Sequence, residues 1–62
     1  MRLIVKLLDI PKLDGLIEDN EFIRKVIKPD QYGGWFVDTD KIQEVERLLK
    51  KSGIRYKIKN DN

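Results

Sequence analysis

The apolar residues of the C-terminal half repeat with the spacing of a helix. Between Asp40 and Ser52 they follow one another at intervals of three, three and one, which places four of them on one stripe: Ile42, Val45, Leu48 and Leu49. Gly53 is typical of a left-handed residue that ends a helix, and it puts Leu49 and Ile54 in the contact positions of a Schellman motif. The pattern predicts an amphipathic helix over 40–52.

Alternating apolar and polar residues predict a strand near each end of the chain. In 54–59 three apolar residues point one way and three basic residues the other, namely Arg55, Lys57 and Lys59. In 2–8 one face carries Leu3, Val5 and Leu7, and the opposite face carries Arg2, Ile4, Lys6 and Leu8. Both strands are therefore expected to bury one face and to expose basic residues on the other.

A short helix is expected after the first strand. Pro11 ends strand pairing because it has no N–H group, and it suits the first turn of a helix. A helix from Pro11 to about Asp19 places Leu13, Leu16 and Ile17 on one side. Gly15 weakens this helix by about 1 kcal/mol relative to alanine.

Residues 22–28 fit two structures. As a continuation of the helix, Ile23, Val26 and Ile27 extend its apolar stripe. As a strand, β-branched residues alternate with basic ones, and Pro29 with Asp30 begins a turn back through the two glycines that follow. The polar run EDNE over 18–21 interrupts the helical pattern, and this favours the strand.

These elements predict a β-α-β-β-α-β chain, a minimal ferredoxin-like α+β fold with a four-stranded antiparallel sheet and two helices on one face. The first and last strands are expected to be central neighbours. If the helix extends to Ile27, the alternative is a three-stranded βαβαβ fold. The whole chain, 1-62, is expected to form a single small domain. A core of this size contributes only about 3–5 kcal/mol, which favours association with a partner or with a second copy.

The residue types exclude several kinds of chemistry. There is no cysteine and no histidine, so that disulfides are absent and a zinc site is not expected. The only serine and threonine, Ser52 and Thr39, fall at helix ends. No glycine-rich phosphate-binding loop occurs. We therefore expect no enzymatic activity, no cofactor, no metal and no small-molecule substrate.

Two aspartates near the start of the long helix are expected to cap it. Asp38 as the N-cap makes Val37 and Ile42 a hydrophobic staple, whereas Asp40 as the N-cap pairs with Gln43. A Mg²⁺ or Ca²⁺ site is the weaker interpretation, because the EF-hand spacing is absent.

The hydrophobic staple also orients the aromatic residues of the preceding strand. If Val37 points into the core, alternation turns Trp35 inward and leaves Phe36 exposed. The two glycines before Trp35 are then the turn by which the chain re-enters the sheet.

The candidate binding face is the side of the sheet away from the helices. Its predicted members are Arg2, Ile4, Lys6, Phe36, Arg55, Lys57 and Lys59. Ile4 and Phe36, with Leu8 as a further member, form an apolar patch rimmed by basic residues, which suits another protein or a second copy. An edge strand could also bind a partner, by pairing its unpaired backbone groups with a strand of that partner. The favoured function is therefore a small binding or regulatory module that acts by protein–protein contact or homodimerisation.

Nucleic-acid binding by the same basic face is the alternative function, because RNA-recognition domains of this fold use this face. The net charge of +2 says little by itself. The apolar runs are too short to span a bilayer, so we expect a cytoplasmic protein with no membrane partner. Small regulators, toxin–antitoxin partners and phage-encoded inhibitors share this profile.

Overall fold

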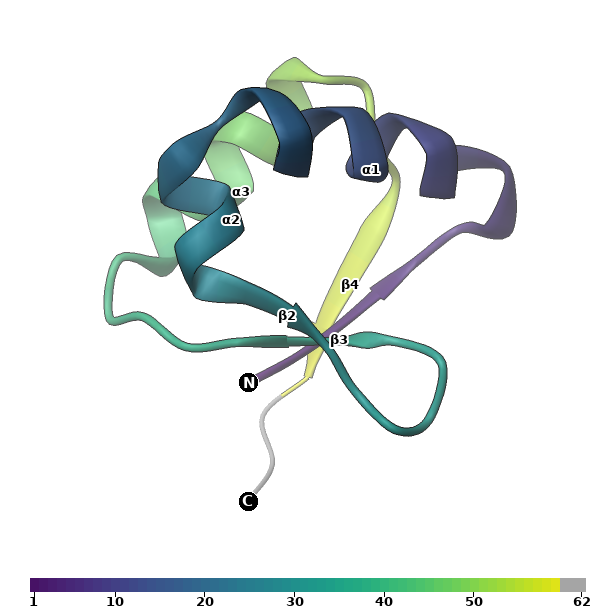
Figure 1. The fold of residues 1–62 in the computed structure, drawn as a ribbon, viewed down its shortest axis with the longest axis horizontal. Coiled ribbons are helices and arrows are strands. Elements are labelled where there is room, and N and C mark those ends of the chain that lie inside the picture. Colours follow the sequence, from purple (N-terminus) through teal and green to yellow (C-terminus); the bar gives the residue numbers. More distant parts are fainter. Residues whose placement is uncertain (60–62) are drawn as a thin grey trace.

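The protein is a four-stranded antiparallel sheet with helices packed on one face, seen in a computed structural model that describes residues 1–59 (Figure 1). Its elements are β1 (Arg2–Val5), the 3₁₀ turn η1 (Leu7–Asp9), α1 (Ile10–Asp19), α2 (Glu21–Val26), β2 (Ile27–Pro29), β3 (Trp35–Val37), α3 (Ile42–Lys51) and β4 (Tyr56–Lys59). The strand order β2-β3-β1-β4 confirms the predicted ferredoxin-like α+β layout and excludes the three-stranded alternative. In the part described, no helix is long and apolar enough to cross a membrane.

The register of the sheet places β1 between β3 and β4. Arg2 lies opposite Phe36 on one side and Lys59 on the other. The first and last strands are neighbours, as predicted. However, β4 lies at an edge, and β3 is the second central strand. The reason is topological: β3 and β4 are both antiparallel to β1, and α3 carries the chain across β1 from one to the other.

The core lies between the sheet and the helices. Its largest fully buried side chains come from β1, α1, α2, β2 and α3, and are Leu3, Leu13, Ile23, Ile27, Leu49 and Val45. Apart from Leu7, the predicted inward residues of both terminal strands and the predicted helical stripes supply or pack against this core. Each element thus buries the face that its hydrophobic pattern indicates.

The first strand is shorter than predicted. It ends at Val5, and the chain turns at η1, so that Leu7 and Leu8 are each 80% exposed instead of continuing the two strand faces. The cause is Asp9, whose carboxylate accepts the Arg55 backbone N–H at 2.9 Å and thereby takes the place of the Lys6 carbonyl, which would accept it in a longer strand. The Asp9 N–H in turn donates to the Lys6 carbonyl at 2.8 Å.

The preference for a strand over 22–28 is wrong for most of that segment. Residues 21–26 form α2, and only the last residues of the segment enter β2. The interruption at EDNE is real: Asn20 ends α1 with an extended backbone, and its side chain accepts the Ile23 N–H at 3.0 Å to cap α2. The helical alternative also holds here in part, because α2 buries Ile23 and Val26.

The prediction for the C-terminal end of α3 is confirmed, whereas the prediction for its N-terminal end is wrong. At the C-terminus the Schellman motif is confirmed: Gly53 has φ +72, and the Ile54 N–H donates to the Leu49 carbonyl at 3.0 Å. At the N-terminus the predicted caps are wrong. Lys41 occupies the N-cap position without a side-chain cap, and the Thr39 hydroxyl accepts the Lys41 N–H at 3.0 Å. Neither Asp38 nor Asp40 caps the helix, because α3 begins later than expected, at Ile42.

Candidate functional site

The outer face of the sheet gathers the residues predicted to bind. Arg2 and Ile4 come from β1, Phe36 from β3, and Lys57 and Lys59 from β4. The register aligns one row across all four strands, in the order Lys28, Phe36, Arg2 and Lys59. Lys6 and Arg55 lie just beyond the ends of β1 and β4, joined by a backbone hydrogen bond of 3.1 Å. Lys28 was missed as a member, although its alternation with the buried Ile27 was a usable signal.

Two exposed apolar side chains lie on the two central strands of this face, Ile4 on β1 and Phe36 on β3. Ile4 is 38% exposed and Phe36 is 41% exposed, whereas Trp35 is half-buried and packs against the core. The predicted orientation of the two neighbouring aromatic residues is therefore confirmed. Leu8 is not part of the face, because it belongs to η1 beyond the end of the strand.

The β2–β3 turn is built around one carboxylate. Asp30 accepts the Tyr32 N–H at 2.8 Å and the Gly34 N–H at 2.9 Å. These hydrogen bonds, that from Gly34 first, hold the pKa of Asp30 below its usual range. A side chain on Gly34 would place its Cβ 3.1 Å from the Leu3 carbonyl oxygen. This distance is shorter than most Cβ contacts, so a larger residue at this position requires the turn or β1 to shift by a few tenths of an ångström.

This turn brings an aromatic residue to the face that the sequence analysis did not include. Tyr32 is 74% exposed, and the Arg2 guanidinium lies 5.5 Å from the centre of its ring. The Arg2 Nε is also 3.7 Å from Asp30 Oδ2. The sequence placed Tyr32 in a predicted turn, which indicates that its side chain is exposed. It did not indicate which strand the Tyr32 side chain approaches.

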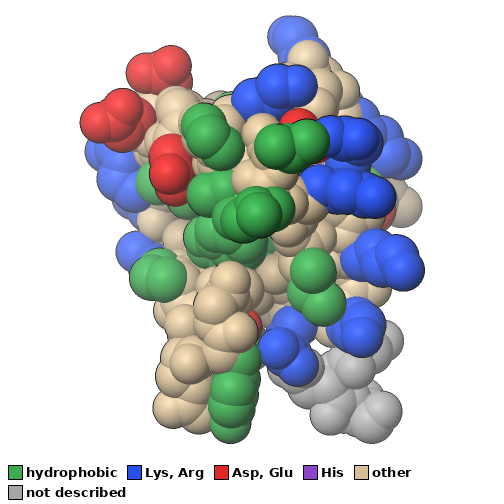
Figure 2. Space-filling view, turned by 90° about the vertical axis from the view of Figure 1, so that its right-hand side faces the viewer, with side chains coloured by type: hydrophobic (Ala, Val, Ile, Leu, Met, Phe, Trp, Pro, Cys, Tyr) green, Lys and Arg blue, Asp and Glu red, His purple; other side chains and the backbone are tan. Residues whose placement is uncertain are grey.

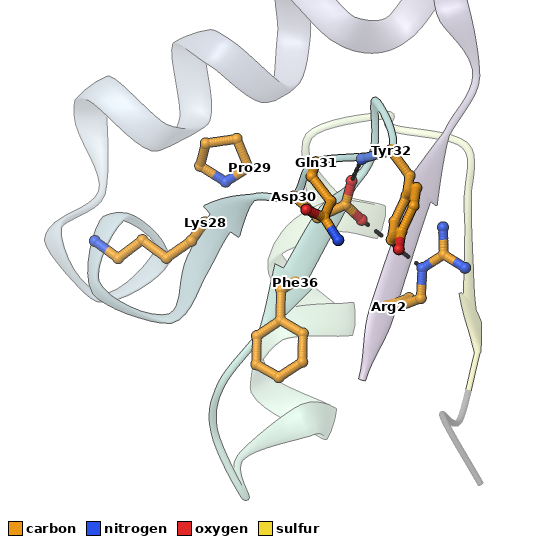
Figure 3. Close-up of a pocket in the computed structure, with 7 residues that line it drawn as sticks. All are labelled: Arg2, Lys28, Pro29, Asp30, Gln31, Tyr32 and Phe36. Atoms are coloured by element: carbon orange, nitrogen blue, oxygen red, sulfur yellow. Dashed lines mark hydrogen bonds and ion pairs between the residues drawn. The ribbon is translucent and has the colours of Figure 1, made fainter.

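An open depression lies between these side chains (Figure 3). Lys28 and Arg2 stand on opposite sides of Phe36, and the Tyr32 ring stands beside Arg2. The full lining is Arg2, Lys28, Pro29, Asp30, Gln31, Tyr32 and Phe36. A second open depression extends along β1 and β4 and is lined by Ile4, Val5, Lys6, Arg55, Tyr56, Lys57 and Lys59.

One of the predicted cations is held by a buried acid. Asp9 is only 3% exposed, and it accepts the Arg55 Nε at 2.9 Å and the Arg55 backbone N–H at 2.9 Å. These hydrogen bonds lower the pKa of Asp9 to about 2, and Lys12 at 3.8 Å adds to the effect. Arg55 therefore has a structural role, and its charge is compensated locally.

The remaining lysines of the face carry its net charge. Within residues 1–59, no ion pair involves Lys6, Lys28, Lys57 or Lys59. Figure 2, a side view of the molecule, shows Lys and Arg side chains gathered along its right-hand flank, exposed hydrophobic side chains at its centre and acidic side chains at its upper left. The outer face thus combines two exposed apolar side chains, Ile4 and Phe36, with Arg2 beside them on β1 and lysines that are largely unpaired.

Comparison with known protein families, with curated proteins and with solved structures finds no match for this chain. Its fold and surface define a small ferredoxin-like α+β protein with an open, basic sheet face. Because this fold serves many functions, the function has to be argued from the face itself.

Proposed function

We propose that the protein is a small non-enzymatic binding module that contacts another protein through the outer face of its sheet. The observation that carries this proposal is the exposed pair of Ile4 and Phe36 at the centre of a face whose other side chains are mostly charged. Exposed apolar groups within a polar rim are the usual anatomy of a protein-binding surface. A large side chain at the centre of such a patch supplies most of the affinity.

The charge of the rim selects an acidic partner. In a twofold-symmetric dimer through this face, each lysine rim would meet the same rim of the other copy, because such interfaces are self-complementary. Like charges at an interface oppose association. The exposed acidic residues of α1 and the start of α2 offer a second copy a complementary surface, and they are Asp14, Glu18, Asp19 and Glu21. That contact is head-to-tail and does not close, so a different, acidic protein is the partner we propose.

One observation favours a second candidate, the binding of single-stranded nucleic acid. Tyr32 and Phe36 are both exposed beside Arg2 and Lys28, around the same depression. Exposed aromatic rings next to cations are how sequence-tolerant single-strand binders stack bases and track phosphates. This candidate predicts affinity that falls log-linearly with salt, with a slope of about −0.7 for each phosphate contacted.

The decisive experiment is site-specific cross-linking. A photoreactive phenylalanine analogue replaces Phe36 in one variant. In the control variant it replaces Leu8, which lies off the face and is more exposed than Phe36, so that accessibility alone would favour cross-linking by the control. We expect the first variant alone to cross-link a protein in the cells that carry the gene. The partner identified in this way is then purified. It should bind the double variant Ile4→Ser with Phe36→Ser at least tenfold more weakly than it binds the unmodified protein.

Two results would contradict the protein-binding proposal. The first is equal affinity of the purified partner for the unmodified protein and for the double variant, which would show that the face does not take part in the interaction. The second is cross-linking of nucleic acid alone by the analogue at position 36. In that case a steep salt dependence, measured by fluorescence anisotropy with an oligouridine probe, would establish the second candidate instead.

A further inference from the structure

The free edge of β4 carries backbone groups that point away from the sheet. The Lys6 N–H donates to the Arg55 carbonyl, and in an antiparallel ladder the hydrogen-bonded pairs alternate with non-bonded ones. The pairs Ile4–Lys57 and Arg2–Lys59 are therefore the bonded ones. It follows that the N–H and C=O groups of Tyr56 and Ile58 point outward, toward the open edge.

The opposite edge of the sheet has no such donors. In the ladder between β2 and β3 the Asp30 N–H donates to the Gly34 carbonyl, and the Asp38 N–H donates to the Val26 carbonyl. Because bonded and non-bonded pairs alternate, the backbone groups of Ile27 and Pro29 point outward. The Ile27 N–H is taken by the Ile23 carbonyl at the end of α2, and proline has no N–H. Of the two edges that the structure describes, β4 alone presents free N–H groups.

The side chains along β4 determine what can lie beside it. Lys57 and Lys59 point to the outer face, and the half-buried Tyr56 and Ile58 point to the helix side. An added strand would place alternate residues beside the lysines and the others beside Tyr56 and Ile58. Acidic residues suit the first positions and apolar residues the second. A second copy of β4 is unsuitable, because it would set lysine beside lysine, a known protection of edge strands.

We propose that the edge of β4 binds an extended segment of a partner protein in which acidic and apolar residues alternate, as a fifth strand of the sheet. The backbone groups of Tyr56 and Ile58 form its hydrogen bonds, and Lys57 and Lys59 pair with its acidic side chains. The inference rests on the proposed function as a protein-binding module. Lys57 and Lys59 belong to both surfaces, but the backbone groups of the β4 edge are distinct from the patch of Ile4 and Phe36, so variants of the edge backbone and of the patch separate the two proposals.

The test uses a synthetic peptide with the repeat Glu-Val, and as a control the same composition in a non-alternating order. Binding is measured by nuclear magnetic resonance titration of the full chain. We expect the alternating peptide to bind and to slow amide exchange at Tyr56 and Ile58. Ile58→Pro removes the outward N–H without removing a bond to β1, and Ile58→Ala controls for the lost side chain. The dissociation constant should rise at least tenfold in the proline variant relative to the alanine variant.

A second arm does not depend on how well the proline variant folds. Lys57→Glu with Lys59→Glu changes only exposed side chains, and it should abolish binding of the Glu-Val peptide while creating binding of a Lys-Val peptide. Unchanged binding of the Glu-Val peptide to this variant would overturn the proposal, as would failure of the peptide to bind the unmodified chain at millimolar concentration. Binding that is lost only after Ile4→Ser with Phe36→Ser would also overturn it, and would leave the proposed face intact.

Discussion

The turn at η1 predicts that two leucines of the first segment differ sharply in their effect on stability. Leu7 is 80% exposed, whereas Leu3 is fully buried in the core. Full burial of a leucine side chain contributes about 1.5–3 kcal/mol, and a fifth of that is about 0.3–0.6 kcal/mol. Leu7→Ala should therefore lower the free energy of unfolding by no more than this amount. Leu3→Ala also leaves a cavity, and such changes cost about 2.7–5 kcal/mol.

The difference is large compared with the stability of the whole domain. At about 0.05–0.15 kcal/mol per residue, a chain of this length is stable by about 3–9 kcal/mol. Leu3→Ala should consequently remove at least about a third of the stability of the domain, while Leu7→Ala should shift the melting temperature by less than about 5 °C. Urea unfolding followed by far-ultraviolet circular dichroism measures both. A loss above about 1.5 kcal/mol in Leu7→Ala would refute the turn, because it would place Leu7 in the core of a longer strand.

Two further predictions concern titratable groups. The pKa of Asp9 is lowered from 3.8 to about 2 by its hydrogen bonds from Arg55, so its ionised form stabilises the fold above pH 3.8, and this contribution is lost as the pH falls toward 2. Urea midpoints measured between pH 2 and 6 should show this loss, and Asp9→Asn should flatten the curve in that range. Burial, followed by the hydrogen bond to Glu46, raises the pKa of Tyr56 to about 12. Stability should therefore fall as the pH rises from 10 to 12. Ultraviolet difference spectra of the folded protein should show Tyr56 ionising near pH 12. Ionisation of Tyr56 near pH 10 in the folded protein would contradict the geometry.

The parts of the fold that sequence predicted best are those specified by neighbouring residues. The C-terminal end of α3 is an example, because Gly53, Leu49 and Ile54 lie within six positions and together define one hydrogen-bonded motif. The first strand shows the opposite case. Its alternation continues to Leu8, but the strand ends early because Asp9 binds Arg55, a residue 46 positions away. No local pattern contains that contact.

The candidate face was predictable to a similar extent. Alternation assigned Ile4, Lys57 and Lys59 to the exposed side, since side chains in a strand point to opposite faces in turn. For Phe36 alternation had to be combined with the expectation that Val37 points into the core. What alternation cannot give is the position of a turn relative to a distant strand. Tyr32 reaches the face only because Asp30 folds the turn back toward β1. For the same reason the pairing of Arg55 with a buried acid was not foreseen.

The charges on β4 connect the two proposed surfaces. Lys57 lies opposite Ile4 and so belongs to the rim of the face, and it also lies on the strand whose other edge is free. Pairing of either surface with the same surface of a second copy would bring like charges together, and in both proposals the same lysines attract an acidic partner. Specificity of this kind depends on repulsion from the wrong partner as much as on attraction to the right one. In both proposals the basic residues of β4 therefore oppose pairing of the sheet with a second copy and favour an acidic partner.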